Sequence, residues 1–177
     1  GPYAERSLVK SVTWDENHSE VLEFRNKTDQ VVLKRVKASE TAWANTYYVY
    51  DEFGNLRFVL PPELIKNIGL VQQQPYTPSQ DELDNFAFQY KYDARKRMTE
   101  KKIPGAEWVY MVYDPRDRLV ATQDGNQRAT SPYQWTFTKY DELNRPILTG
   151  IKDTAVNTQV DMQNGVTLHY SKLNAKW

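Results

Sequence analysis

The sequence predicts a mainly β protein, in which antiparallel hairpin repeats form a curved, open sheet interrupted by a short helical insertion. One short pattern occurs four times. It consists of Tyr-Asp, three further residues, a polar residue and then a residue that is apolar in most copies. The segments beside it alternate between apolar and polar residues, which is the period of a β-strand. The chain also contains 12 Tyr, 6 Phe and 5 Trp, and aromatic rings suit the pleated, half-buried surface of a sheet.

The recurring pattern marks out successive repeats along the chain. Its four full copies begin at Tyr50-Asp51, Tyr92-Asp93, Tyr113-Asp114 and Tyr140-Asp141, and the polar residue that follows is Asn55, Arg97, Arg118 and Arg145 in turn. In a degenerate first copy, Arg25-Asn26 stands in place of Tyr-Asp, and Gln30 is the polar residue that follows. The interval from Asp51 to Asp93 is twice the interval from Asp93 to Asp114, so an insertion is expected between these two copies.

Each copy is expected to form a strand, a tight turn and a returning strand. An Asp at a strand end can accept a hydrogen bond from the backbone N–H two residues on, which starts a reversal of the chain. Gly54 and Asn144 stand where a left-handed backbone is needed, and Pro115 fits the second position of a type I turn. Because a lone hairpin is marginal in water, the copies are expected to stack side by side.

Five segments are expected in chain order. Residues 1–20 are interpreted as a tag remnant and lead-in, 21–60 as the first hairpins, 61–85 as a helical or loop insertion, 86–151 as the repeat hairpins, and 152–177 as terminal strands or a tail. The Gly1-Pro2 start resembles the remnant of a cleaved expression tag. Residues 86–92 and 133–139 alternate between aromatic and other residues, and VTLHY near the end also has the composition of a strand.

The insertion breaks the strand pattern and is expected to contain short helices near residues 61–68 and 78–85. Pro61-Pro62 can open the first helix and Gly69 can close it. For the second, Thr77 is the expected N-cap, with Pro78 at the first helical position. The alternative interpretation is an irregular polar loop.

Composition excludes several classes of function. Lys+Arg and Asp+Glu are both 23, so the formal charge is zero, which argues against nucleic acid or an anionic membrane as a partner. No apolar run approaches the roughly 18 to 20 residues needed to span a bilayer. The absence of Cys excludes disulfides and thiolate metal sites. No phosphate loop and no known metal-binding spacing occurs, so no cofactor is expected.

Taken together, the four full copies resemble the YD repeats of bacterial RHS proteins. The residues that carry this resemblance are YVYDEFGNLRFVLPP, YKYDARKRMTEKKIPG, YMVYDPRDRLVATQDGNQR and TKYDELNRPILTG. The Pro-Pro segment and MVYDPRDRLVATQDGNQR are similar to the large surface or secreted RHS proteins of Bacteroidetes. The resemblance covers roughly residues 21–151. It implies part of a β-ribbon that spirals into a hollow shell, which in toxin members encloses a toxic polypeptide.

This sequence also departs from the YD pattern. Asn55 and Gln30 stand where the family has Arg, and only Gly54 keeps the turn glycine of the family. No segment matches the RHS core motif that closes the shell and supports self-cleavage. We therefore expect that this fragment forms part of the wall of the shell and does not cleave itself.

The resemblance implies a structural, non-catalytic role in a shell or surface scaffold. Its structural repeat positions are Tyr50, Asp51, Gly54, Tyr92, Asp93, Arg97, Tyr113, Asp114, Arg118, Tyr140, Asp141 and Arg145. The expected partners are neighbouring repeats of the parent chain and an enclosed toxin polypeptide, and the expected location is secreted or the bacterial cell surface. Because a fragment of a spiral has unpaired edge strands, self-association through those edges is also expected.

The alternative function is a surface module that binds a glycan or a protein through exposed aromatic rings. Trp108, Trp135 and Tyr133 are the candidate contacts, since flat rings can stack on sugar faces. At strand periodicity, however, such rings usually serve the packing of the sheet itself. No enzyme is expected, because the Asp residues occur one per repeat and neither of the two His lies in a known catalytic motif.

Overall fold

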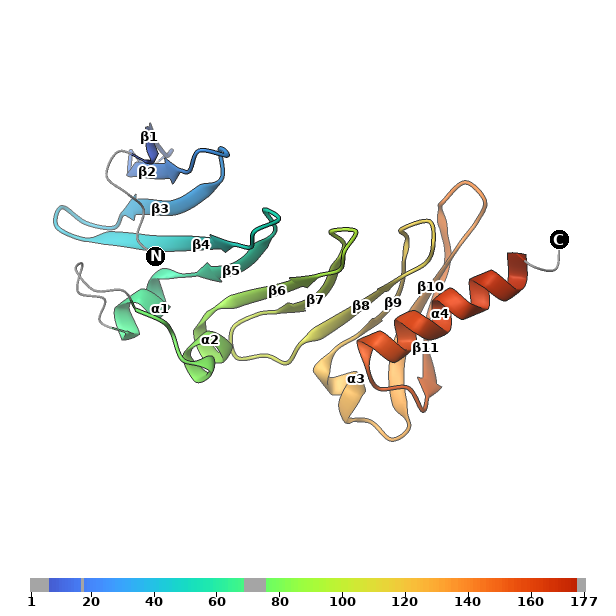
Figure 1. The fold of residues 1–177 in the computed structure, drawn as a ribbon. Coiled ribbons are helices and arrows are strands. Elements are labelled where there is room, and N and C mark those ends of the chain that lie inside the picture. Colours follow the sequence, from blue (N-terminus) through green and yellow to red (C-terminus); the bar gives the residue numbers. More distant parts are fainter. Residues whose placement is uncertain (1–6, 17, 69–75, 175–177) are drawn as a thin grey trace. The chain divides into compact units, whose positions relative to one another are not determined.

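The computed structural model describes residues 7–16, 18–68 and 76–174. Eleven strands of this part of the chain are hydrogen-bonded in chain order, antiparallel, in an open sheet (Figure 1). They are β1 (Val9–Trp14), β2 (Glu20–Arg25), β3 (Val31–Lys37), β4 (Trp43–Tyr50), β5 (Leu56–Leu60), β6 (Phe88–Tyr92), β7 (Met98–Lys102), β8 (Val109–Tyr113), β9 (Leu119–Gln123), β10 (Tyr133–Tyr140) and β11 (Pro146–Thr154). The predicted mainly β fold with an open antiparallel sheet is confirmed.

The described residues also form helices, and the chain divides into two compact units. The helices are α1 (Pro62–Asn67), α2 (Gln80–Phe86), α3 (Gly125–Ala129) and α4 (Gln159–Asn174). The first unit comprises Gly1–Gln89 with Ile103–Gly105, and the second comprises Tyr90–Lys102 with Ala106–Trp177. Each unit has its own buried residues, so each is described by itself.

The first unit is built on the meander from β1 to β5, in which each strand pairs with the next. Leu22 of β2 and Val32 of β3 are buried, and α1 contributes Leu64, which is fully buried. Burial of each of these apolar side chains contributes about 1.5–3 kcal/mol to the stability of the unit.

The two helices of the insertion lie near their predicted positions, but their ends differ. The first spans 62–67 and not 61–68, and its predicted closing residue Gly69 lies outside the described residues. The second spans 80–86 and not 78–85, and its N-cap is Ser79 and not Thr77. The Ser79 hydroxyl accepts from the Glu82 N–H at 3.3 Å, while the Glu82 carboxylate accepts from the Ser79 N–H at 2.7 Å. This reciprocal capping box outweighs the helix-opening preference of proline.

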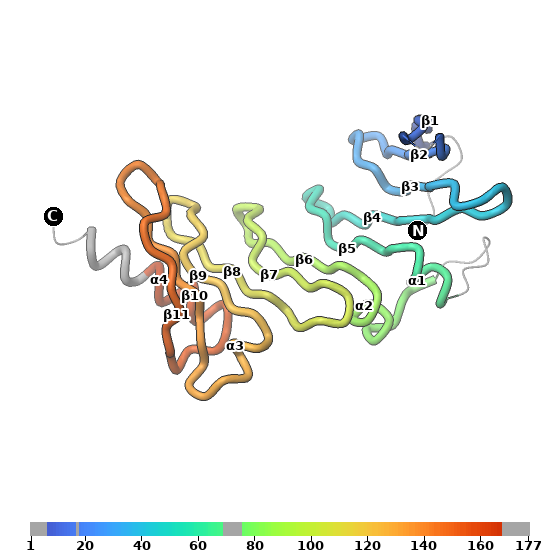
Figure 2. The backbone as a smooth tube through the Cα atoms, turned by 180° about the vertical axis from the view of Figure 1, so that it is seen from behind, coloured from blue at the N-terminus to red at the C-terminus, as the bar shows by residue number. Residues whose placement is uncertain are grey.

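The second unit contains a hydrophobic core between its sheet and α4. Val112, Val120, Ala121 and Trp135 of the strands are buried together with Met162 of the helix. In both views α4 lies across one face of the strands β8 to β11 (Figures 1 and 2). The core therefore depends on a helix that follows the last strand in the chain.

Two glutamines of α4 bind the backbone of β8. The Gln159 side chain donates to the Met111 carbonyl at 2.8 Å. The Gln163 side chain donates to the Tyr113 carbonyl at 2.7 Å and accepts from the Tyr113 N–H at 2.9 Å. Four helical residues rise about 6 Å and two strand residues span about 7 Å, so side chains four apart on a helix match alternate strand residues. A glutamine amide thus takes the place of a neighbouring strand's peptide group.

The C-terminal region corrects the expectation of terminal strands or a tail at residues 152–177. Strand β11 ends at Thr154, and α4 then covers VTLHY, which has the composition of a strand. Thr158 caps the helix by accepting from the Asp161 N–H at 3.1 Å. Met162 packs into the core four residues before Val166. Helical packing on the sheet therefore outweighs the local β-propensity of this segment.

Candidate functional site

The candidate functional site is the array of turns formed by the repeats. Each turn Asp uses Oδ1 to accept from two backbone N–H groups, two and four residues further on. The pairs are Phe53 and Asn55 for Asp51, Arg95 and Arg97 for Asp93, Arg116 and Arg118 for Asp114, and Leu143 and Arg145 for Asp141. The predicted Asx turn is therefore present in every full copy, and it gains a second backbone donor.

One residue of each turn adopts a left-handed backbone. These residues are Asp29, Gly54, Lys96, Asp117 and Asn144, with φ between 61° and 80°. Gly and Asn adopt this conformation at low cost, whereas in Lys96 the Cβ atom crowds the following carbonyl oxygen, at a cost of about 1–2 kcal/mol. The sequence predicted it at Gly54 and Asn144. The hydrogen bonds of the turn impose it at the other positions.

The second carboxylate oxygen of each turn Asp binds the side chain four residues later. Arg97, Arg118 and Arg145 donate their Nε to Asp93, Asp114 and Asp141 at 2.7, 2.6 and 2.7 Å. In the first unit, Asn55 donates to Asp51 at 3.0 Å, and Asn26 donates to Gln30 at 2.9 Å. In the two copies that lack Arg at this position, neutral amide side chains therefore make the equivalent contact.

The same side chains reach the following turn. Because the strands alternate in direction, the turns β6–β7, β8–β9 and β10–β11 lie at one end of the second unit (Figure 1). Arg97 donates to the Asp114 carbonyl and to the Asp117 carboxylate, and Arg118 donates to the Asp141 carbonyl. In the first unit, Gln30 donates to the Gly54 carbonyl at 3.0 Å. Within each unit, these side chains therefore join one repeat turn to the next.

Tyrosine hydroxyls make a second set of links between successive hairpins. Tyr50, Tyr113 and Tyr140 donate to the carbonyls of Val31, Met98 and Leu119, at 3.0, 2.8 and 2.9 Å. Each acceptor is the residue directly after the polar slot of the preceding copy. Arg97 also lies over the Tyr113 ring at 4.9 Å, and Arg118 lies over the Tyr140 ring at 5.1 Å. Tyr113 and Tyr140 thus bind the neighbouring hairpin through both ring and hydroxyl, and Tyr50 binds it through its hydroxyl.

Replacing Tyr113 by phenylalanine should lower the free energy of unfolding by about 0.5–1.5 kcal/mol, the usual contribution of one hydrogen bond. The ring remains beneath Arg97, so the loss reports the hydroxyl alone. Tyr133→Phe is the matched control, because the Tyr133 hydroxyl has no partner among the described residues. Urea denaturation followed by circular dichroism measures both variants. Equal stability of the two variants would contradict a role for the hydroxyl link.

The pKa values of three turn carboxyls, those of Asp51, Asp93 and Asp141, are lowered by their hydrogen bonds. In Asp141, hydrogen bonds from the backbone and then the side chain of Arg145 lower the pKa below its ordinary value. In Asp93, desolvation raises the pKa, but hydrogen bonds from its partner arginine outweigh this effect and the pKa is lowered. The same balance lowers the pKa of Asp51, where the hydrogen bonds come chiefly from Asn55.

These lowered pKa values predict a loss of stability in acid. A carboxyl whose pKa is lower in the folded state stabilises the fold above the unfolded pKa of about 3.9, and this contribution disappears as pH falls through the folded value. Urea midpoints should therefore change little between about pH 7 and 5 and decrease below about pH 4. In Asp93→Asn the decrease should be shallower. A midpoint that increases on acidification would contradict the prediction.

A further turn of this kind was missed in the sequence, within the predicted lead-in 1–20. Strand β1 lies there, and Trp14-Asp15 ends it. The Asp15 side chain accepts from the Ser19 N–H at 2.8 Å, and His18 has a left-handed backbone. The signal was an aromatic residue followed by Asp, with a polar residue four positions later. This turn joins β1 to β2, at the end of the strands opposite to the Asn26 turn.

The structure places the predicted glycan contacts in different surroundings. Trp135 is fully buried and donates its indole N–H to the Val156 carbonyl at 2.8 Å, so its ring is not available at the surface. We therefore assign Trp135 to the core. Trp108 is half-buried, with the Lys91 ammonium 4.4 Å from its ring centre. Tyr133 is also half-buried.

Within residues 7–16, 18–68 and 76–174, no group of three or more His, Asp or Glu side chains is arranged to hold a metal ion. In the same part of the chain, no helix has the length and apolar character needed to cross a membrane. Each turn carboxylate has backbone donors of its own, which fits a role in holding the turn.

Comparison with known proteins finds similarity in fold only. No protein-family model matches the chain, and no match is found among curated proteins. The chain is similar to part of a Photorhabdus luminescens Tc holotoxin pore carrying a TccC3 mutation, with a TM-score of 0.52 and 11% identity, over 88% of this chain and 8% of that one. It is also similar to part of a TcdB2-TccC3-Cdc42 structure, with a TM-score of 0.55 and 12% identity, over 89% of this chain and 8% of that one.

A third structure, TcdB2-TccC3 without its hypervariable C-terminal region, gives a TM-score of 0.53 at 12% identity, over 85% of this chain and 7% of that one. The chain therefore spans less than a tenth of the length of the solved chains that it matches. At these identities, the similarity establishes the fold of the hairpin array.

Proposed function

We propose that this chain is a non-catalytic wall segment of a larger RHS protein of the Bacteroidetes type, secreted or held at the bacterial surface, whose stacked hairpins help to enclose a toxin. The observation that carries the proposal is the linkage from turn to turn. Each Asp holds its own turn. The side chains that bind the neighbouring hairpin are those of Tyr50, Tyr113, Tyr140, Gln30, Arg97 and Arg118. Contacts of this kind stabilise extended walls repeat by repeat.

The comparisons support this proposal. One matched structure is a Tc holotoxin pore, and the others are TcdB2-TccC3 structures. Most of this chain aligns with a small part of those chains, as expected for one stretch of a long repetitive wall. In such a wall, the partners of this segment are neighbouring repeats of the same polypeptide and the enclosed toxin.

Protease protection in the full-length polypeptide that carries this segment tests the wall role. An enclosed toxin should resist proteinase K in the wild type and become digestible in Asp114→Ala, which breaks a buried link of the wall. Glu142→Ala is the control, because Glu142 is exposed at a turn tip and has no partner among the described residues. Equal digestion in wild type and Asp114→Ala, or particles without a hollow interior by electron microscopy, would refute the proposal.

The second candidate is a glycan-binding surface, favoured by Trp14, which is 67% exposed at the end of β1. Exposed tryptophan rings are the usual stacking surface for sugars. A glycan array probed with this chain and with Trp14→Ala decides the question. Saturable binding that is lost in the variant supports the candidate, and absence of binding in both eliminates it.

A further inference from the structure

Strands of adjacent hairpins separate toward their turns, and α4 uses one of the resulting gaps. Among the described residues, β7 pairs with Val109 and Tyr110 of β8 and with no later residue of that strand. Beyond this pairing, the backbone groups of β8 that face β7 are bound by Gln159 and Gln163 of α4. The β7–β8 gap is therefore a site at which a helix docks through side-chain amides.

The β9–β10 gap has the same construction one repeat later. Strand β9 pairs with Thr136 and Phe137 of β10, and no described residue of β9 pairs with the residues of β10 that follow. The Tyr140 hydroxyl spans this gap to the Leu119 carbonyl, just as the Tyr113 hydroxyl spans the earlier gap. Both gaps are therefore bounded by strand pairing at one end and by a tyrosine at the other.

The backbone groups in the two gaps point the same way. Asp114 and Asp141 each donate their N–H to a carbonyl four residues later, across their own turn. Because successive N–H groups of a strand point to opposite sides, the N–H groups of Tyr113 and Tyr140 face the preceding hairpin. The Tyr140 backbone is thus placed to bind a glutamine amide as the Tyr113 backbone binds Gln163.

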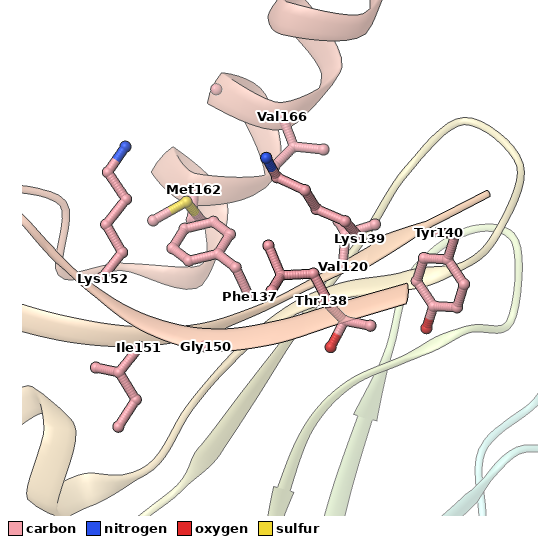
Figure 3. Close-up of a pocket in the computed structure, with 12 residues that line it drawn as sticks. Val120, Phe137, Thr138, Lys139, Tyr140, Gly150, Ile151, Lys152, Met162 and Val166 are labelled. Carbon is pink, nitrogen blue, oxygen red and sulfur yellow. The ribbon is translucent and has the colours of Figure 1, made fainter. Parts of the chain in front are cut away.

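A groove of about 700 Å³ opens on the β9–β10 gap (Figure 3). Its lining includes residues from both sides of the gap, Val120 of β9 and Tyr140 of β10, and α4 forms its opposite wall. Gly150 on the strand side and Gly165 on the helix side keep the groove open, since a Cβ atom added at either would meet no atom within 4 Å. The second gap is therefore accessible from the face of the sheet that α4 covers.

The spacing of the repeats fits a second helix beside α4. Each repeat contributes two strands, and strands lie about 4.8 Å apart, so successive repeats are about 10 Å apart. Helices that pack side by side have their axes about 8–10 Å apart. A helix that docks on β10 as α4 docks on β8 therefore contacts α4, and Gly165 permits its close approach.

The two gaps differ in the side chain beside them. Val112, which is buried in one cluster with Met162, corresponds to Lys139 in the later repeat. Lys139 is exposed and has no hydrogen bond or ion pair with a described residue, and Figure 3 shows it on the same side of the sheet as Met162. A helix at the second gap therefore needs an acidic residue where α4 has Met162. Its pattern is Gln-x-x-Glu-Gln, in which the outer residues correspond to Gln159 and Gln163.

We propose that the β9–β10 gap binds a second helix, of the pattern Gln-x-x-Glu-Gln, which another part of the parent polypeptide supplies. This source rests on the function proposed above, in which the chain is one stretch of a longer wall. Two helices of this chain set the precedent. In each unit a helix follows a hairpin and packs back on a strand that leads into a repeat turn, α1 on β4 and α4 on β8.

A labelled peptide with the sequence of residues 158–174, carrying Met162→Glu and Gly165→Ala, is the probe for this site. Alanine raises its helix propensity, and the glutamate keeps it out of the apolar site that α4 occupies. Fluorescence anisotropy should show saturable binding to this chain, which is lost when the peptide also carries Gln159→Ala and Gln163→Ala. Lys139→Glu in the chain should weaken binding about tenfold, and a peptide with Met162→Lys should restore it.

Two leucine variants of the chain test the place of binding. Gly165→Leu should abolish binding, because the new side chain fills the groove without a clash. Asn164→Leu adds the same side chain to α4 at an exposed position outside the groove, and it should bind like the wild type. The proposal is overturned if Gly165→Leu folds normally and keeps wild-type affinity, or if the peptide without its glutamines binds equally well.

Hydrogen exchange at two amides identifies the gap and the source of the helix. In this chain the Tyr140 N–H should exchange faster than the Tyr113 N–H, and the peptide should slow it. In the full-length polypeptide the Tyr140 N–H should be protected without peptide. Rapid exchange there, or peptide binding that leaves Tyr140 unchanged, would overturn the proposal. Peptide binding is measured without a toxin, so a failure of toxin enclosure in the protease experiment would refute the wall role separately.

Discussion

Replacement of Asp114 by alanine should lower the free energy of unfolding by about 3–5 kcal/mol, the cost of removing one partner from a buried ion pair. The Asp114 side chain is completely buried, and it accepts from two backbone N–H groups and from the Arg118 guanidinium. The alanine variant leaves that guanidinium, only 13% exposed, without its carboxylate. Urea denaturation followed by circular dichroism measures the loss.

Asp141→Ala is the matched control, because it occupies the same place in another turn. Its partner Arg145 is 71% exposed, so water replaces the lost contact and the variant should be affected much less. Equal losses in the two variants would show that burial is not the cause.

A second variant separates charge from turn geometry. Asn26 and Gln30 already form a neutral version of the pair, in which Gln30 also reaches the next turn. Asp114→Asn combined with Arg118→Gln should therefore be more stable than Asp114→Asn alone, because no unpaired charge remains buried. If the double variant is the less stable of the two, the ion pair itself is required.

Replacement of Trp135 by alanine should lower the free energy of unfolding by about 3–5 kcal/mol, as is usual when a buried tryptophan is truncated. Trp135 is fully buried among Val112, Ala121 and Met162, and its ring centre lies 6.4 Å from that of Tyr110. Since Met162 belongs to α4, the variant should also raise hydrogen exchange throughout that helix.

Two further variants test whether the loss of stability comes from the buried ring of Trp135. Trp135→Phe keeps much of the ring volume and loses the hydrogen bond to Val156, so it should remain folded with a smaller loss. Trp14→Ala removes a tryptophan that is 67% exposed and should change the stability by less than about 0.5 kcal/mol. An unchanged exchange rate in α4 of Trp135→Ala would contradict the assignment of Trp135 to the helix contact.

The repeat pattern was sufficient to predict the strand–turn–strand units of the fold. Each turn is closed by contacts between residues two and four apart, such as those of Asp93 with Arg95 and Arg97. Interactions over such short separations depend on the local residues alone, which is why a pattern of five or six residues is informative. The degenerate copy at Asn26 was recognisable for the same reason.

Other features could not be predicted, because their partners are distant in the chain. The hydroxyl links run to the preceding hairpin, from Tyr113 to Met98 and from Tyr140 to Leu119, and no local pattern indicates that acceptor. The alternation of residues places Trp135 on one face of its strand but does not indicate which face is covered, and its burial depends on α4.

The sequence by itself therefore determined the turns, the strand directions and the order in which the hairpins follow one another, because these depend on neighbouring residues. Only the tertiary structure decided that residues 159–174 form a helix, that Gln159 and Gln163 bind β8 some 48 and 50 residues away, and that a groove opens beside Gly150. These features arise when a long-range contact buries apolar surface and satisfies backbone groups, and such a contact outweighs local propensity.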